Sequence, residues 1–126
     1  MELRITERNG RPFAEAADHE PLDMRDVNDA IGFCFAHGDS RLLLHADNLP
    51  PGFFDLSTGV AGALLQKFRQ YRVKVAVVWS PQEVRHTARF AEMVAEENRG
   101  PVFRVFEDEA AAQDWLTTDV APGTPR

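Results

Sequence analysis

The segments Arg41-Leu-Leu-Leu-His-Ala-Asp-Asn-Leu49 and Val73-Lys-Val-Ala-Val-Val-Trp79 decide the fold of this chain. Each contains an apolar run, which is typical of parallel strands that are buried on both faces. The amphipathic stretch between them is long enough for a right-handed crossover helix. A site in such a unit lies outside the carboxyl ends of its strands. The sequence therefore predicts a site in residues 46–59 and 79–83.

Toward the amino terminus, the sequence predicts a hairpin followed by a helix. Leu3–Arg8 and Arg11–Ala17 flank Asn9-Gly10, a pair typical of a two-residue type I′ turn. Asp23 is expected to cap the helix at its start. Gly38 is expected to end it in the left-handed conformation.

Toward the carboxyl terminus, Ser80-Pro-Gln-Glu83 has the pattern of a capping box, with serine as N-cap and proline at the first helical position. The helix that it opens is expected to end near Asn98. Val102–Phe106 is the last predicted strand, and a short helix follows at Glu109–Leu116. Thr117–Arg126 has no apolar pattern and is expected to form a flexible tail.

Together these elements predict an α/β fold in a single domain, residues 1–116, with a mixed sheet of about five strands. The hairpin is antiparallel. The strands at residues 42–46, 73–78 and 102–106 form a parallel βαβαβα unit.

Composition excludes several classes of protein. The 126 residues carry a net charge of −6 with a pI of about 5.1, and nucleic-acid binding needs basic surface. No apolar run approaches the roughly 20 residues of a membrane span, and no signal peptide is recognisable. The single cysteine, Cys34, suits the cytoplasm and falls on an apolar helical stripe, where an inert core thiol is expected.

The candidate site residues cluster at the predicted strand ends. The candidates for ligand or partner binding are His45, Asp47, Asn48, Phe53, Phe54, Asp55, Ser57, Thr58 and Trp79. Phe53, Phe54 and Trp79 are expected either to line an apolar pocket or to pack in the core. Ser57 and Thr58 are placed in the first turn of a helix, where a phosphate would meet free N–H groups. The alternative is that Asp55 or Ser57 only caps that helix.

His45 and Asp47 are two residues apart at a strand end and so share one face. They suit an acid–base pair or two metal ligands. Two ligands without a third do not make a metal site, so we expect no metal and no cofactor. The alternative is a structural histidine that is hydrogen-bonded within the loop.

Four stretches together resemble one bacterial family over most of the chain, from about Asp18 to Leu116. They are Ser40-Arg-Leu-Leu-Leu-His45, Phe53-Phe-Asp-Leu-Ser-Thr-Gly-Val-Ala-Gly62, Leu65-Gln-Lys-Phe68 with Tyr71-Arg72, and Glu97-Asn-Arg-Gly100. The family is catalogued as domain of unknown function 4180. The resemblance implies no established activity.

Asp55-Leu-Ser-Thr-Gly59 is similar to the Asp-Ser-Ser-Gly phosphorylation motif of STAS domains, the fold of anti-sigma-factor antagonists. Residues 79–85 and 105–111 are similar to two strand–helix junctions of the same domains. The resemblance implies phosphorylation at Thr58 or at Ser57, because Leu56 separates the acidic residue from the hydroxyl pair.

The preferred interpretation is a non-catalytic, STAS-like regulatory or protein-interaction module in the cytoplasm, with residues 46–59 as its recognition surface. We expect Leu49, Phe53 and Phe54 to be exposed there. One alternative is a small-molecule-binding protein with an apolar pocket at the strand ends. The other is an enzyme that uses His45, Asp47 and Ser57, although the sequence has no nucleophile elbow and no phosphate loop.

The sequence also predicts a homodimer. Gly59, Gly62 and Ala63 form a face of small residues on one helix. Such a face permits the close approach of a second copy across a two-fold axis.

Overall fold

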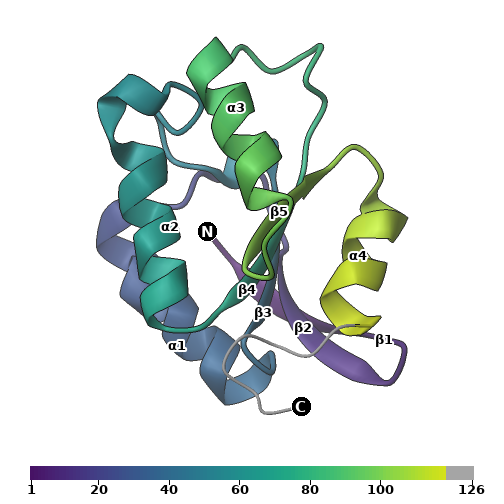
Figure 1. Ribbon diagram of the computed structural model, residues 1–126. Helices are drawn as coiled ribbons and strands as arrows, with labels where there is room; N and C mark the ends of the chain where they lie inside the picture. The colour runs from purple at the N-terminus through teal and green to yellow at the C-terminus, as the bar shows by residue number, and fades with distance from the viewer. Residues whose placement is uncertain (119–126) are drawn as a thin grey trace.

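The computed structural model describes residues 1–118, which form one five-stranded sheet with helices on both faces (Figure 1). The strands lie across the sheet in chain order: β1 (Leu3–Arg8), β2 (Arg11–Ala16), β3 (Arg41–His45), β4 (Lys74–Val78) and β5 (Phe103–Phe106). The pair β1 and β2 is antiparallel, and every other neighbouring pair is parallel. The predicted α/β fold with a mixed sheet is confirmed.

The helices are divided unequally between the two faces. Three of them connect successive parallel strands and lie on one face: α1 (Val27–His37), α2 (Val60–Gln70) and α3 (Ala88–Glu97). The fourth, α4 (Glu109–Thr118), follows the last strand and covers the opposite face (Figure 1). Right-handed crossovers between strands that pair in chain order all fall on the same side, which explains the position of the first three helices.

Alternation along the strands supplies both cores. Leu42 and Leu44 on β3 face the larger core under α1, α2 and α3, together with Phe103 on β5. Leu43, between the two leucines, faces the smaller core, where it meets Leu116 of α4. The central strands are therefore buried on both faces, as their apolar runs predict.

The helix that was predicted from Ser80 begins only at Ala88. Its N-cap is Thr87, whose hydroxyl accepts from the Phe90 N–H at 3.2 Å. The Ser80 carbonyl accepts from the Val84 N–H at 2.9 Å, but this turn does not continue into a helix. The chain instead crosses to the loop before α2, where the Thr87 N–H donates to the Phe54 carbonyl at 3.1 Å. Tertiary contact thus outweighs the local capping signal.

Of the conformations predicted for two glycines, one is confirmed and one is wrong. Asn9 and Gly10 have φ of 55° and 74°, as the predicted type I′ turn requires. Gly38 has φ of −107°, so its predicted left-handed conformation is wrong. In the turn between α1 and β3, the left-handed conformation is adopted instead by Asp39 and Ser40, with φ of 54° and 57°. A Cβ at Gly38 would lie 2.8 Å from the Ala14 backbone nitrogen, so glycine permits α1 to end close against β2.

The helix predicted at Glu109–Leu116 is two residues longer in the structure. Helix α4 continues through Thr118, and the buried Thr117 hydroxyl accepts from the Asn9 side chain at 3.0 Å. The rest of the predicted tail, residues 119–126, lies outside the described residues.

The small residues of α2 lie at the surface. Gly59, Gly62 and Ala63 are exposed, and a Cβ at either glycine would meet no other atom. The homodimer that these residues suggest stays a prediction. Within residues 1–118, no helix combines the length and apolar character needed to cross a bilayer.

Candidate functional site

An open groove of about 560 Å³ lies at the carboxyl ends of β3, β4 and β5, at the edge of the sheet where the sequence predicts a site. The residues that line it come from the connections after these strands and from the segment before α1. They are His19, His45, Ala46, Asp47, Phe54, Val78, Trp79, Ser80, Glu83, Val84 and Glu107.

The position of the groove follows from the topology. The chain leaves β4 toward α3 on one face of the sheet and leaves β5 toward α4 on the other (Figure 1). Connections that part in this way open a crevice between neighbouring parallel strands, which is the usual ligand site of such sheets. Trp79 follows β4 and Glu107 follows β5, and both line the groove.

Aromatic side chains form one wall. The rings of Phe54 and Trp79 are nearly parallel, with an interplanar angle of 5° and centroids 6.2 Å apart. The ring of the buried Phe90 packs against both. Its centroid lies 5.2 Å from that of Phe54 and 5.8 Å from that of Trp79. His86 lies in the loop before α3, and its ring packs against Trp79 with the centroids 5.0 Å apart. The wall is therefore held by packing on several sides.

Two histidine–carboxylate pairs stand beside this wall. The Nε2 atom of His45 lies 2.8 Å from a carboxylate oxygen of Glu109, so this pair links the end of β3 to the first turn of α4. The Nδ1 atom of His19 lies 2.7 Å from Asp47, so the second pair links the segment before α1 to the loop after β3. The His19 side chain is largely exposed, whereas His45 is half-buried, and each pair joins two segments of the chain beside the groove.

Asn48 is a structural residue and does not line the groove. Its side chain is fully buried, donates to the Asp18 and Glu20 carbonyls at 2.9 Å and 3.0 Å, and accepts from the His45 N–H at 2.9 Å. These bonds hold the segment before α1 against the end of β3. Asn48 therefore positions both His19 and His45.

Ser57 and Thr58 precede α2 and are not in its first turn. They lie in a 3₁₀ helix, Leu56–Thr58, that is separated from α2 by Gly59 with φ of 80°. Asp55 caps this turn by accepting from the Ser57 N–H at 3.0 Å and from its hydroxyl at 2.6 Å. The Thr58 hydroxyl donates to the Gly52 carbonyl at 2.7 Å. Asp55 therefore caps the 3₁₀ turn, whereas the N-cap of α2 is Gly59, and phosphorylation of either hydroxyl stays a prediction.

The expected apolar exposure of the loop after β3 is wrong for two of its three residues. Phe53 is 0% exposed and Leu49 is 5% exposed, because both pack in the larger core. Phe54 alone is half-exposed and reaches the groove. A loop stiffened by two prolines thus turns its apolar side chains inward.

The three residues that an enzyme was expected to use each form a hydrogen bond with a different partner. His45 contacts Glu109, Asp47 contacts His19, and Ser57 contacts Asp55. Cys34 lies on the buried face of α1, and this burial raises the pKa of its thiol to about 12. Within residues 1–118, no group of three histidine, cysteine or acidic side chains is placed to hold a metal ion.

Four groove residues lie outside the predicted site segments and the named candidates: His19, Val78, Val84 and Glu107. Val84 was assigned, with Ser80 and Glu83, to a helix that begins only at Ala88. Glu107 could have been found, since it follows a predicted parallel strand directly. His19 lies in a polar connector, and nothing in its local sequence shows that it reaches Asp47.

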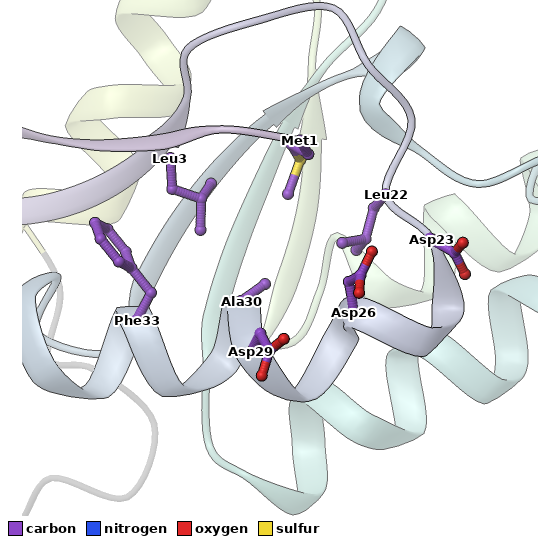
Figure 2. A pocket seen from close by; sticks show the side chains of 8 residues that line it. All are labelled: Met1, Leu3, Leu22, Asp23, Asp26, Asp29, Ala30 and Phe33. Carbon is purple, nitrogen blue, oxygen red and sulfur yellow. The ribbon is translucent and has the colours of Figure 1, made fainter.

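A second cavity of about 270 Å³ lies between the amino-terminal strand and α1. Figure 2 shows Met1 and Leu3 pointing from this strand toward the helix, where three aspartates stand at the rim. Its lining is Met1, Leu3, Leu22, Asp23, Asp26, Asp29, Ala30 and Phe33. Hydrogen bonds from Arg25 lower the pKa of Asp23 to about 2, so this carboxylate already has a cation. The groove is larger and lies at the strand ends, so it is the stronger candidate.

The fold and the groove define an α/β domain with a candidate binding site at the carboxyl ends of its parallel strands. The chain belongs to the family described as Domain of unknown function (DUF4180), whose model matches residues 8–116. The resemblance to this family is thereby confirmed, and the more distant resemblance to STAS domains stays a prediction. No curated protein and no solved structure matches the chain.

Proposed function

We propose that this protein is a non-catalytic binding module that takes a small molecule in the groove at its strand ends. The observation that carries the proposal is the supported aromatic wall of Phe54 and Trp79 beside an open space of about 560 Å³. Small-molecule sites occupy roughly 300–1,000 Å³ and combine apolar walls with a few polar groups. The groove has both, with Val78 and Val84 adding apolar surface.

The protein-interaction surface expected from the sequence has less support. That expectation relied on exposed Leu49 and Phe53, which are buried. The Ser57 hydroxyl donates to Asp55, the Thr58 hydroxyl donates to the Gly52 carbonyl, and neither residue lines the groove. The structure therefore favours the alternative in which a small molecule occupies an apolar site.

A binding role is also favoured over catalysis. A serine–histidine nucleophile needs the histidine within hydrogen-bond reach of the serine, whereas the Ser57 hydroxyl donates to Asp55 and His45 bonds to Glu109. His45 and Asp47 bond to separate partners, and each of these bonds fastens one loop to another. Their geometry supports rigid positioning of the walls.

A fragment screen by NMR tests the proposal. The two tryptophans give two indole N–H signals, and Trp79 lines the groove whereas Trp115 is buried between α4 and the sheet. Small aromatic fragments are expected to shift the Trp79 signal at saturating concentration and to leave the Trp115 signal in place. Phe54→Ala should weaken binding about tenfold or more, because it removes half of the wall.

Phe35→Ala is the matched control, since Phe35 is an aromatic side chain of α1 that is 50% exposed and does not line the groove. A screen in which no fragment moves the Trp79 signal would contradict the proposal. So would equal losses of affinity in Phe54→Ala and Phe35→Ala.

A further inference from the structure

The charge of the groove identifies the class of ligand. Asp47, Glu83 and Glu107 line it from three separate connections, those after β3, β4 and β5. Among the described residues that line it, none is lysine or arginine. The two histidines of the lining already contact carboxylates, Asp47 and Glu109. A ligand in the groove therefore meets negative charge from several directions.

We propose that the ligand is a small organic cation, an ammonium group attached to a flat apolar body. The inference rests on the proposed function of the groove and adds the sign of the ligand's charge. The apolar body lies against Phe54 and Trp79, and the ammonium group lies among the three carboxylates. An indole ring is the strongest aromatic partner for a cation, so Trp79 attracts both parts of such a ligand.

An anion of the same shape is disfavoured for the same reason. Its charge would lie near Asp47, Glu83 and Glu107 without a lysine or arginine of the lining to offset them. Repulsion of this kind sets specificity as effectively as attraction does. Because Glu83 and Glu107 are exposed, salt should weaken their contribution.

The test compares three probes of nearly equal shape: phenethylamine, phenethyl alcohol and hydrocinnamate, which are cationic, neutral and anionic at neutral pH. Binding is measured by titration of the Trp79 indole signal in the intact chain. Phenethylamine is expected to bind at least about tenfold more tightly than hydrocinnamate at low ionic strength, with the difference shrinking in about 0.5 M salt.

Two substitutions locate the effect. Glu83→Gln and Glu107→Gln are each expected to weaken phenethylamine binding about threefold and to leave phenethyl alcohol unaffected, because they remove charge at nearly constant shape. Glu92→Gln is the matched control, since Glu92 is an exposed residue of α3 outside the groove. An unchanged Trp115 signal reports that each variant is folded.

The outcomes separate the two proposals. If phenethyl alcohol or hydrocinnamate binds as tightly as phenethylamine, or if Glu92→Gln weakens binding as much as Glu83→Gln, the assignment of a cation is wrong and the groove remains a binding site. If none of the three probes moves the Trp79 signal up to saturation, the proposed function of the groove fails as well.

Discussion

One of the two tryptophans lies at each end of the parallel strands. The charged side chain beside it is buried at one end and exposed to solvent at the other. At the amino ends, Lys74 is buried on β4 and its ammonium lies 4.3 Å from the centre of the Trp115 ring. The ammonium also donates to the Trp115 carbonyl at 2.6 Å. At the carboxyl ends, Trp79 is half-exposed beside carboxylates that face solvent.

The comparison shows how one sheet can separate stability from recognition. Trp115 is only 7% exposed, and the guanidinium of Arg104 approaches its ring to 5.2 Å, so the cations at this end are part of the packing. At the other end the ring of Trp79 packs against Phe54, His86 and Phe90 and borders open space. The amino ends use aromatic–cation contact to hold α4 in place, whereas at the carboxyl ends the aromatic wall borders open space, where we propose that a cationic ligand binds.

The largest expected effect is on stability, at the amino ends. Trp115→Ala should lower the free energy of unfolding by about 4 kcal/mol, because it empties a core site under α4 and removes the ring beside Lys74. Trp79→Ala should cost about 2 kcal/mol, since its ring is partly exposed already. Urea denaturation compares the two, and an equal loss at Trp79 would contradict the division between the ends.

A second substitution tests whether the carboxyl ends contain a structural residue as well. Asn48→Ala should lower the free energy of unfolding by about 3 kcal/mol, because it removes a fully buried side chain and leaves the Asp18 and Glu20 carbonyls and the His45 N–H without their partner. It should also broaden the NMR signals of the His19 ring, which is the clearer sign of a released loop. Asp47→Asn, which removes charge from a largely exposed neighbour, is the control and should change stability by less than about 1 kcal/mol.

A third test concerns the loop that forms the rim of the groove. Thr87→Ala should destabilise the fold by about 1 kcal/mol, the usual cost of losing an N-cap hydroxyl. Ser80→Ala should change the free energy of unfolding by at most a few tenths of a kcal/mol, because α3 does not begin there. If thermal or urea denaturation showed a larger loss of stability for Ser80→Ala than for Thr87→Ala, the helix that the sequence predicts from Ser80 would be supported instead.

The smallest expected effect is at the pair of His45 and Glu109. Glu109→Gln should cost about 0.5 kcal/mol or less, since half of the Glu109 side chain is exposed and solvent screens the pair. Denaturation midpoints at low and high salt should differ less for this variant than for the unsubstituted chain. A loss above about 2 kcal/mol would show that this end of the sheet depends on charge for its stability, as the amino ends do.

The fold was largely predictable because its strongest signals are periodic and local. Apolar runs located the central strands, and Asn9-Gly10 located the hairpin turn. The start of α3 was not predictable in this way. Ser80-Pro-Gln-Glu83 satisfies the local rules for a capped helix, yet the Thr87 N–H bonds to a carbonyl that is distant in sequence, at Phe54. Local propensity cannot represent such a contact.

The candidate site was predictable in position but not in composition. Strand ends indicated His45, Asp47, Phe54 and Trp79, which do line the groove. The rule that places sites at strand ends does not say which way a loop side chain turns, so Asn48 and Phe53 were included although both are buried. His19 was missed because its contact with Asp47 depends on a connector folding back across the end of β3.

The division of the helices between the two faces also affects how the chain is made. Phe13, Leu43 and Ala76 belong to strands β2, β3 and β4, and the helix that covers them is α4, which follows all five strands in sequence. During synthesis the first face gains its helices one by one, whereas the second face stays uncovered until residues 109–118 have left the ribosome. A nascent chain would therefore carry an apolar sheet face through most of its synthesis. Premature termination before Glu109 would make that exposure permanent and would favour aggregation.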